Sequence, residues 1–395
     1  MMKKTVLDQP VRGKRVIIRS DLNVPIENGE ITDDTRIKAS LETIKYVLNC
    51  PAKVIVLSHL GRVKTEADRE KYSLQVVAKR LSELLKEEVK FINATRGLEV
   101  EEAVLKMKDG EIILLENTRF EDLNGNKESG NDDVLSSYWA SLGEVFINDA
   151  FGAAHRRHAS NVGIAKRLPN AIGFLVKKEL EHLTMMIEKP KRPLVIILGG
   201  AKVKDKIGVL RSLVNFADYI LIGGGMSLTF LKALGYNVGS SFVDEESLSF
   251  CKEIYQQYQD KIILPNDVVV GSSFTPMSTS RLINITDFYS NDIGMDIGVQ
   301  TINNFKKILM EAKTIFWNGP VGVFEVDKFN IGTRKLCEIL TISHAKTIIG
   351  GGDTAFAVTK FGFKDKVTYL STGGGAALKL IEGKSLPAIE IINDK

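Results

Sequence analysis

The stretch that decides the fold is PLVIILGGAKVKDKIGVLRSLVNFA, residues 193–217. Its first six residues are near-continuously apolar, which is typical of a strand buried on both faces of a parallel sheet. Residues 203–217 carry apolar side chains at three- and four-residue spacing, which predicts an amphipathic helix. A strand, a glycine-containing turn (199–202) and a helix in this order predict one unit of a doubly wound α/β fold.

The same order recurs along the chain. Further apolar runs predict strands at RVIIR (15–19), KVIVL (53–57), EIILL (111–115), EVFIN (144–148), DYILI (218–222), KIIL (261–264), KTIFW (313–317), KTII (346–349) and VTYL (367–370). Helical spacing separates several of them, at residues 35–49, 73–87 and 301–312. The polar stretch 272–292 predicts a surface strand and loop. Ten strands fit two sheets better than one, so the predicted fold class is α/β with two lobes.

The lobes are predicted to be joined by a helix over residues 173–189, which Pro190 ends. This assigns residues 1–172 to an N-terminal lobe and residues 190–383 to a C-terminal lobe. A length of 395 residues agrees with two or three domains at roughly 150 residues each.

The overall composition excludes several classes of protein. With 53 Lys and Arg against 49 Asp and Glu, the net charge of +4 is too small for a polycation that binds nucleic acid. The three cysteines lie far apart without a CxxC motif, which predicts reduced thiols. The N-terminal sequence has no signal-like apolar segment, and no run reaches the roughly 20 apolar residues of a membrane span. We therefore expect a cytoplasmic protein without a membrane partner.

Arginine and glycine are unevenly distributed. Twelve of the 16 Arg residues lie at or before Arg167, and 22 of the 33 Gly residues lie at or after Gly199. Guanidinium groups suit a small, densely anionic ligand, whereas glycine clusters let backbone N–H groups approach phosphates closely. The two lobes are therefore predicted to bind different anions.

Basic residues in the first half follow the ends of the predicted strands, where open α/β sheets bind ligands. The residues that would converge there are Arg36, His59, Arg62, Arg119 and Arg156. A single exposed arginine more often makes a weak surface ion pair. Four arginines at strand ends favour a site for one phosphate and a second anionic group.

Glycine-rich turns in the second half follow strands and precede helices. They lie at residues 199–202, 223–226, 317–320, 350–354 and 371–375. A helix N-terminus offers unpaired N–H groups and a partial positive charge, which makes such turns phosphate sites. Tight packing explains one such turn equally well, but five on one sheet favour a nucleotide.

Two common nucleotide motifs fit poorly. Gly383-Lys384-Ser385 resembles the end of a Walker A loop, but Leu378 stands where that motif needs its first glycine. Residues 350–355 fit the dinucleotide fingerprint GxGxxA, yet no acid that could bind a ribose follows the strand at 367–370.

Two other functions stay open at this point. One is an NAD-dependent dehydrogenase, which would need that acid and a catalytic base. The other is a non-catalytic two-lobe protein that closes on an organophosphate, which would not need Lys202, Asp353 and several glycine-rich turns. His155 and His158 lack a third nearby ligand for a metal site.

The motifs resemble those of the phosphoglycerate kinase family. They occur in order from about residue 15 to residue 380: SDLNVP (20–25), ITDDTRI (31–37), SHLGR (58–62), LLENTRF (114–120), NDAFGAAHRRHAS (148–160), LGGAKVKDKI (198–207), GGGMSLTFL (223–231), WNGPVGVFE (317–325), IIGGGDTA (348–355) and STGGGA (371–376). The resemblance implies two Rossmann-like lobes joined by a hinge helix, with residues 384–395 returning to the first lobe. It also implies a monomer.

The activity implied by the resemblance is reversible phosphoryl transfer from 1,3-bisphosphoglycerate to Mg-ADP, giving 3-phosphoglycerate and ATP in glycolysis. The implied contacts of the phosphoglycerate are Asp21, Leu22, Asn23, Arg36, His59, Leu60, Gly61, Arg62, Arg119 and Arg156. Those of the nucleotide are Gly200, Ala201, Lys202, Lys206, Gly224, Asn318, Glu325, Gly351, Gly352, Asp353 and Thr354. Arg36, Lys202, Gly373 and Gly374 would be catalytic, and Asp353 would be linked to Mg²⁺.

The chain departs from the family pattern at Leu22, Arg157, Asn266 and Val299. These positions lie beside the motifs, so the departures bear on affinity or loop stiffness more than on the activity. An acyl phosphate is exchanged with a carboxylate, which is already ionised at pH 7. Catalysis is therefore expected to need lobe closure and charge stabilisation but no general base.

Overall fold

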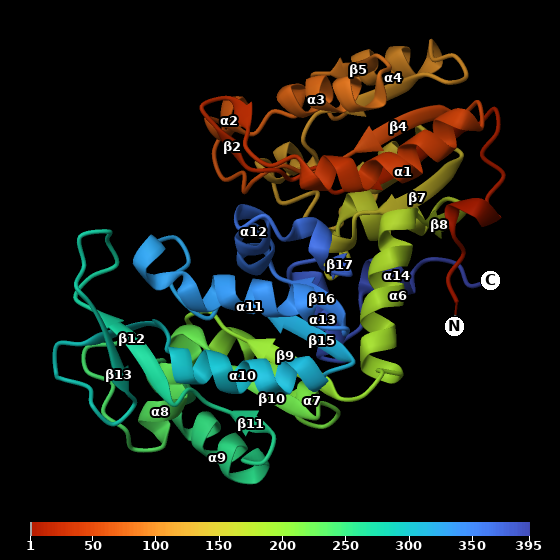
Figure 1. The fold of residues 1–395 in the computed structure, drawn as a ribbon. Coiled ribbons are helices and arrows are strands. Elements are labelled where there is room, and N and C mark those ends of the chain that lie inside the picture. The colour runs from red at the N-terminus through yellow and green to blue at the C-terminus, as the bar shows by residue number, and fades with distance from the viewer. Residues whose placement is uncertain (1) are drawn as a thin grey trace. The chain divides into compact units, whose positions relative to one another are not determined.

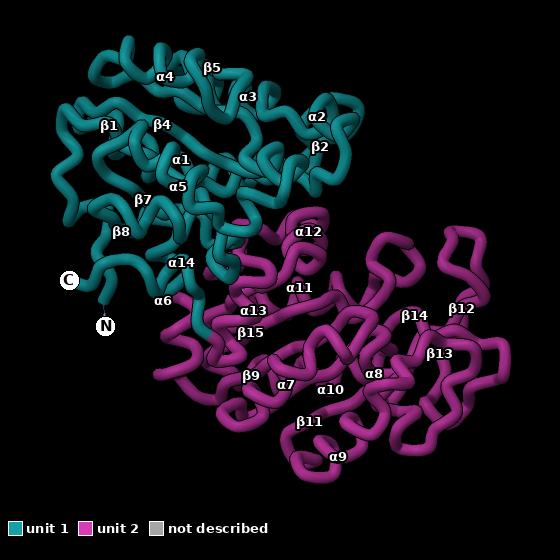
Figure 2. The backbone as a smooth tube through the Cα atoms, turned by 180° about the vertical axis from the view of Figure 1, so that it is seen from behind, with its two compact units in different colours: residues 1–181, 385–395 teal, residues 182–384 magenta. Residues whose placement is uncertain are grey.

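The computed structural model describes residues 2–395, which divide into two compact units (Figure 2). The first unit contains residues 2–181 and 385–395, and the second contains residues 182–384. The division falls inside helix α6 (Phe174–Glu188), so one continuous helix contributes residues to both units. The sequence predicts a joining helix over residues 173–189, with the changes of lobe at its two ends.

The first unit is built on a six-stranded parallel sheet in the order β5-β6-β4-β1-β7-β8 (Figure 1). Its strands are β1 (Arg15–Ser20), β4 (Lys53–Leu57), β5 (Val89–Ile92), β6 (Ile112–Leu115), β7 (Val145–Asp149) and β8 (Asn170–Ile172). Its helices are α1 (Thr35–Asn49), α2 (Asp68–Lys71), α3 (Gln75–Leu85), α4 (Leu98–Leu105), α5 (Asp133–Ser141) and α14 (Pro387–Glu390). A small hairpin, β2 (Ile26–Glu27) with β3 (Glu30–Ile31), follows β1.

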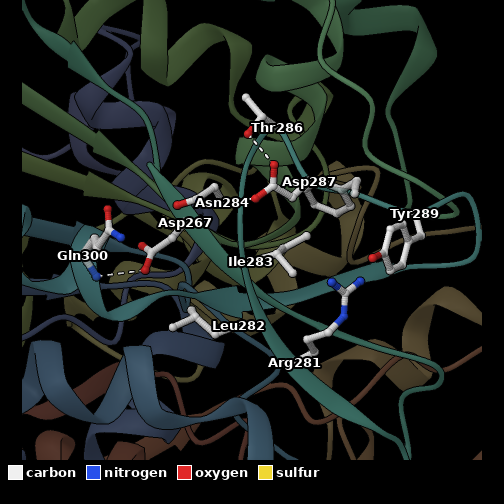
Figure 3. Close-up of a pocket in the computed structure, with 10 residues that line it drawn as sticks. Asp267, Arg281, Leu282, Ile283, Asn284, Thr286, Asp287, Tyr289 and Gln300 are labelled. Atoms are coloured by element: carbon white, nitrogen blue, oxygen red, sulfur yellow. Dashed lines mark hydrogen bonds between the residues drawn. The ribbon is translucent and has the colours of Figure 1, made fainter.

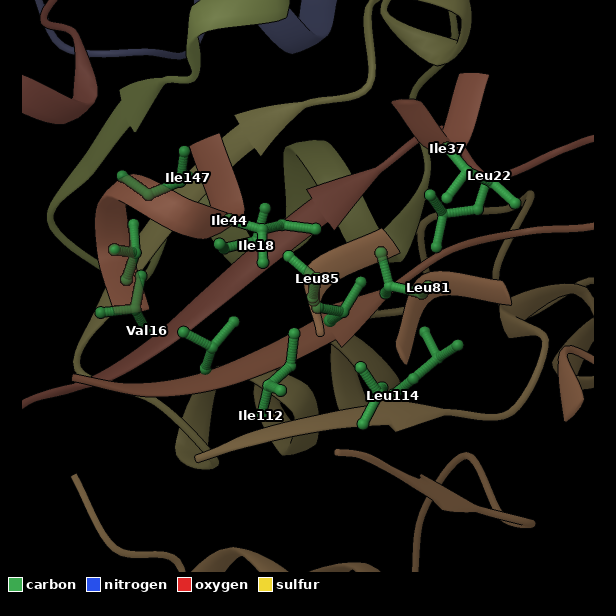
Figure 4. Packing of buried hydrophobic residues seen from close by; sticks show 14 of the residues in the cluster. Val16, Ile18, Leu22, Ile37, Ile44, Leu81, Leu85, Ile112, Leu114 and Ile147 are labelled. Carbon is green, nitrogen blue, oxygen red and sulfur yellow. The ribbon is translucent and has the colours of Figure 1, made fainter. Parts of the chain in front are cut away.

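Both faces of this sheet are buried, which explains why its central strands are apolar at every position. Val16 and Ile18 of β1 join a cluster with Ile44 of α1 and Leu81 of α3 (Figure 4). Ile17, between them in the strand, is equally buried. Because successive side chains point to opposite faces of a strand, Ile17 packs on the other side.

The C-terminal residues pack on the first unit. The Asn148 side chain donates to the Ala388 carbonyl at 2.8 Å, and the Ala388 N–H donates to the Ala154 carbonyl at 3.1 Å. Lys3 donates to the Ile392 carbonyl at 2.7 Å. These contacts join the end of the chain to β7, to the segment that follows it and to Lys3 near the N-terminus.

The second unit contains a parallel sheet in the order β11-β10-β9-β15-β16-β17. Its strands are β9 (Leu194–Leu198), β10 (Tyr219–Ile222), β11 (Ile262–Ile263), β15 (Thr314–Asn318), β16 (Lys346–Gly350) and β17 (Tyr369–Leu370). Numbered along the chain, this is the order 3-2-1-4-5-6 of dinucleotide-binding folds. Its helices are α7 (Ile207–Leu213), α8 (Gly224–Ala233), α9 (Leu248–Tyr258), α10 (Val299–Glu311), α11 (Ile331–Ile342), α12 (Gly352–Lys360) and α13 (Gly375–Ile381).

A second, antiparallel sheet of the same unit has the order β13-β12-β14. Its strands are β12 (Asp267–Gly271), β13 (Ser280–Asn284) and β14 (Ile293–Ile297). The predicted surface strand in 272–292 corresponds to β13. β12 and β14 lie outside that range and were not predicted from the sequence. The α/β fold class and the ten predicted strands are confirmed. Across residues 2–395, no helix combines the length and apolarity needed to cross a bilayer.

Candidate functional site

The predicted anion-binding loops of the first unit lie at the carboxyl ends of its central strands. β1 pairs with β4 on one side and with β7 on the other, so the chain reverses its direction of travel across the sheet at β1. Ligands bind at such a reversal point in open α/β sheets. The loops after β1, β4 and β7 therefore meet at one edge, together with the loop after β6.

Hydrogen bonds lock these loops to one another. The Asn117 side chain accepts from the N–H groups of Leu60 at 3.2 Å and Arg119 at 3.0 Å. The Asn23 side chain accepts from the Gly61 N–H at 2.8 Å. Gly61 has φ +62°, and a Cβ there would lie 2.3 Å from the Tyr72 ring, so this position requires glycine.

Arg36 is held by the carboxylate of Asp21. Its Nη1 donates to Asp21 Oδ2 at 2.7 Å, and Asp21 is only 2% exposed. Leu22, beside Asp21, is fully buried, and its N–H donates to Ser58 Oγ at 2.9 Å. Arg36 opens α1 and is itself half-buried, so the pair fixes a cation at the end of β1.

His59 contacts Arg19, a residue that the sequence predictions did not include. Arg19 is fully buried at the end of β1, and its Nη2 lies 3.1 Å from His59 Nδ1. Burial and the charges of Arg19 and Arg119 hold the pKa of His59 well below its usual range. The imidazole is therefore neutral near pH 7. The apolar run VII (16–18) has an arginine on each side, and only the fold shows that Arg19 is the buried one.

The other arginines form a cluster of positive charge. Burial and the charges of Arg119 and Arg62 lower the pKa of Arg156, which shows that the three guanidinium groups repel one another. Arg119 Nε is buried and has no hydrogen-bond partner among residues 2–395, and the nearest carboxylate, Asp122, is 3.9 Å from Arg119 Nη1. A buried donor without a partner is costly, so this cluster suits an anionic ligand.

The glycine-rich turns of the second unit lie at the carboxyl ends of β9, β10, β15 and β16. A Cβ on Gly199 would lie 2.1 Å from the Pro320 carbonyl oxygen, so the turns after β9 and β15 approach closely. Gly224 has φ +59° and donates to the Val321 carbonyl at 2.9 Å. The Met226 N–H donates to the Gly200 carbonyl at 2.9 Å, which joins the turn after β10 to the turn after β9.

Lys206 lies between the turns after β9 and β15. Its Nζ donates to the carbonyls of Gly199 at 2.5 Å and Asn318 at 2.9 Å. Burial lowers its pKa to about 8, against the opposing effect of the Asp353 and Asp205 carboxylates.

The turn after β16 is tied to the turn after β15. The Gly319 N–H donates to Thr354 Oγ1 at 2.6 Å, and the Asn318 side chain donates to the Gly350 carbonyl at 2.9 Å. Gly351 caps α12 with φ +91°, and Gly352 faces open space. The turn therefore leaves the first N–H groups of α12 accessible to an anion.

The remaining predicted residues of this unit lie on the surface or cap α13. Ala201, Lys202, Glu325 and Asp353 are exposed. Gly374 caps α13 with φ +49°, and the Gly373 N–H donates to Ser371 Oγ at 3.1 Å. Within residues 2–395, the structure brings no hydrogen-bond partner to Lys202 or Glu325.

The residues fit magnesium only as part of a complex with phosphates. Over the described residues, no three His, Cys, Asp or Glu side chains form a group that could hold a metal ion. Asp353 is a single exposed carboxylate in the first turn of α12. Mg²⁺ is commonly held by one or two carboxylates plus substrate phosphates, and the single carboxylate of Asp353 fits the protein's share of that donor set.

A pocket of about 670 Å³ lies elsewhere in the second unit, against β12 and β13 (Figure 3). None of the predicted site residues lines it. Its Asp267 carboxylate already accepts from the Gln300 N–H at 2.9 Å, at the start of α10. Arg281 lies over the Tyr289 ring and pairs with Asp292 at 2.7 Å. The polar groups of this pocket are thus largely engaged within the protein.

Comparison with known proteins agrees with this geometry. The family model described as phosphoglycerate kinase matches residues 6–384. The chain belongs to the phosphoglycerate kinase family. Phosphoglycerate kinases of Enterococcus faecalis and Listeria innocua are 52% and 51% identical to it, over 100% of both chains in each case. Members of this family are kinases, and the chain is accordingly a phosphotransferase of glycolysis.

Solved structures agree in fold. Phosphoglycerate kinase from Coxiella burnetii superposes with a TM-score of 0.87 at 38% identity, covering 98% of each chain. The enzyme from Pyrococcus horikoshii gives a TM-score of 0.88 at 32% identity, covering 99% of this chain and 98% of the other. The two-lobe α/β architecture is thus that of phosphoglycerate kinases.

Proposed function

We propose that the chain transfers a phosphoryl group reversibly from 1,3-bisphosphoglycerate to Mg-ADP, giving 3-phosphoglycerate and ATP. The observation that carries this proposal is the cluster of Arg62, Arg119 and Arg156 in the first unit, above all the buried Nε of Arg119, which has no hydrogen-bond partner among residues 2–395. A small ligand with a phosphate and a carboxylate supplies the acceptors that this cluster lacks.

In this proposal, Arg62, Arg119 and Arg156 bind the phosphate that is not transferred, together with the neutral His59. Arg36 is assigned to the transferring group. Asp21 fixes its guanidinium at the end of β1. Asn23, Leu60, Gly61 and Leu22 shape the loop around the substrate. Hydrogen bonds that the Asn117 and Asn23 side chains accept hold this loop in place.

The nucleotide is assigned to the glycine-rich turns of the second unit. Accessible N–H groups at the start of α12, in the Gly351 to Thr354 turn, would bind phosphate oxygens. Lys202 and the Gly373 and Gly374 amides would stabilise the charge on the transferring group. The other proposed nucleotide contacts are Gly200, Ala201, Lys206, Gly224, Asn318 and Glu325. Asp353 would hold Mg²⁺, which when bound neutralises charge on the phosphates.

No general base is needed in this reaction. The group that attacks ATP in reverse is the carboxylate of 3-phosphoglycerate, which is already ionised at pH 7. Phosphoryl transfer spreads negative charge over three equatorial oxygens, so positioning and cations supply the catalysis.

Arg36 and Lys202 belong to different units, so we propose that a complete site forms only when the units close about the region of α6. Closure would also exclude water, which could otherwise hydrolyse the acyl phosphate or ATP. A monomeric state and a cytoplasmic location are part of the same proposal and follow from the family alone.

The direct test is ATP consumption by the purified protein, coupled to a dehydrogenase that reduces 1,3-bisphosphoglycerate. We expect consumption that requires both 3-phosphoglycerate and magnesium. Consumption that ignores 3-phosphoglycerate would contradict the proposal. So would NAD reduction by the protein itself, or ligand binding without any turnover.

A further inference from the structure

A buried chain of hydrogen bonds extends from the proposed substrate residue His59 into the first unit. Arg19 Nη2 lies 3.1 Å from His59 Nδ1, and Arg19 Nε donates to Ser160 Oγ at 2.8 Å. Ser160 Oγ in turn donates to Glu128 Oε1 at 2.5 Å. Arg19, Ser160 and Glu128 are all fully buried, so the chain is shielded from water.

The direction of each bond in this chain is fixed by chemistry. A guanidinium group has five donors and no acceptor, so His59 Nδ1 must be the acceptor. In a neutral imidazole the proton then resides on Nε2. Nε2 makes no hydrogen bond to any of residues 2–395 that the structure records, which leaves this donor available to a ligand.

Glu128 anchors the chain at its far end. Its Oε2 accepts from the Ser160 N–H at 2.9 Å, and its carbonyl accepts from the Ala159 N–H at 2.9 Å. Ala159–Gly163 form a π-helical turn, a rare element that often occurs at functional sites. Glu128 therefore holds both the backbone of this turn and the hydroxyl that orients Arg19.

Stability alone does not explain why the charges of Arg19 and Glu128 are buried together. Removing Arg19 and Glu128 from water carries a desolvation penalty that their mutual attraction does not reliably recover. Burial raises the pKa of Glu128 and lowers that of Arg19, as expected from this penalty. A role in orienting a neighbouring group would account for the arrangement.

We propose that Glu128 and Ser160 are positioning residues that act through Arg19 to hold His59 as the neutral tautomer with its proton on Nε2. The proposed use of that proton, a hydrogen bond to the phosphoglycerate, rests on the proposed function. The tautomer itself does not, so it can be tested without any ligand.

The other charged groups that face His59 are cationic or neutral. Besides Arg19, these are Arg119, Arg36 and His158. Burial and the nearby arginines lower the pKa of His158 to about 3, so it is neutral as well. Releasing Arg19 from Ser160 would remove a donor from His59 Nδ1 and make that nitrogen easier to protonate. Loss of the chain is therefore expected to raise the pKa of His59 and to admit the other tautomer.

The test is long-range ¹H–¹⁵N NMR of the histidine rings in the ligand-free protein. The chain has only five histidines, and a His59→Gln spectrum identifies the signals of His59. The variants are Ser160→Ala, Glu128→Gln and the control Ser136→Ala. Ser136 is an equally buried serine of the same unit whose hydroxyl donates only to the Asp133 carbonyl. Circular dichroism verifies that each variant folds. If Glu128→Gln does not fold, Ser160→Ala still tests the proposal, because it changes no charge.

In the parent and in Ser136→Ala we expect protonated Nε2, unprotonated Nδ1 and a His59 pKa well below its usual range. In Ser160→Ala we expect a mixture of tautomers, a higher His59 pKa and a KM for 3-phosphoglycerate raised about tenfold. The KM for ATP and kcat should stay within about threefold. A proton on Nδ1 in the parent, or a Ser160→Ala spectrum equal to that of Ser136→Ala, would overturn the proposal. Absence of kinase activity in the parent would instead contradict the proposed function and leave the spectra unaffected.

Discussion

Arg36, the proposed catalytic residue of the first unit, is held in place by a neighbouring carboxylate. Its ion pair with the nearly buried Asp21 fixes the guanidinium before any ligand binds. A cation that needs no rearrangement during the reaction stabilises a transition state best. The same ion pair makes Asp21 a supporting residue as well as a proposed substrate contact.

Replacement of this residue gives a specific prediction. We expect Arg36→Ala to lower kcat about 100-fold or more, because a charge next to the transferring group is lost. The affinity for ATP should stay within about twofold, since the proposed nucleotide residues belong to the second unit. Steady-state kinetics and calorimetric titration with Mg-ATP measure the two effects. Turnover within threefold of the parent would exclude a catalytic role for Arg36.

The proposed substrate residues stand out in the sequence because they follow strands in short polar motifs. Arg19 does not, because it differs from Arg15 only in position: Arg15 starts β1 half-exposed, whereas Arg19 ends it fully buried. Glu128 and Ser160 could not be predicted from a sequence pattern either. Their contact joins a loop before α5 to a turn after β7, and only the fold brings them together.

At the scale of elements, the central strands of both parallel sheets were predictable, whereas β5 and β8 of the first unit were not. The central strands are apolar throughout because both of their faces are covered. β5 and β8 lie at the two edges of the first sheet, and β5 reads VKFI with an exposed lysine. In the antiparallel sheet of the second unit, only the surface strand that corresponds to β13 was predicted, and β12 and β14 were missed.

The turn before α12 allows a matched pair of glycine variants. Gly351 has φ +91°, and a Cβ there would lie 2.7 Å from the Asn318 side chain, whereas a Cβ on Gly352 meets no atom within 4 Å. We expect Gly351→Ala to destabilise the fold by about 1–3 kcal/mol and Gly352→Ala to leave its stability nearly unchanged. If phosphates approach this turn, both variants should weaken Mg-ATP binding. Chemical denaturation and calorimetry measure the two properties, and a stability loss in Gly352→Ala equal to that in Gly351→Ala would contradict the account.

The buried carboxylate of Asp149 accepts hydrogen bonds from the first turn of helix α6. Asp149 Oδ1 accepts from the N–H groups of Leu175 at 3.0 Å and Val176 at 3.2 Å. Burial raises the pKa of Asp149 to about 6 from its ordinary value of 3.8, although Thr43 and the two N–H groups act in the opposite direction. The folded state therefore binds this proton more tightly than the unfolded state.

A raised pKa in the folded state has a defined consequence for stability. The contribution of Asp149 is present in full below about pH 4 and is lost as the pH rises to about 6 and above, by about 3 kcal/mol. Asparagine does not titrate, so the stability of Asp149→Asn relative to the parent should increase by up to that amount between about pH 4 and pH 7. Urea unfolding of both proteins across this range is the measurement. A stability difference that stays constant with pH would refute the buried ionisation.

At the scale of the whole molecule, the proposed sites for the phosphoglycerate and the nucleotide belong to two separate units. The first unit supplies fixed cations and the second supplies accessible N–H groups at helix starts. Their different chemistry explains why arginine is concentrated in one half of the chain and glycine in the other. Neither set of residues alone can bind both the donor and the acceptor of a phosphoryl group.

The central claim is that these two half-sites must come together for transfer. Small-angle X-ray scattering tests it most directly, with samples that contain no ligand, 3-phosphoglycerate, a non-hydrolysable Mg-ATP analogue, or both ligands. The account predicts a smaller radius of gyration with both ligands than with either one alone. A radius with both ligands that equals the smaller of the two single-ligand values would contradict it.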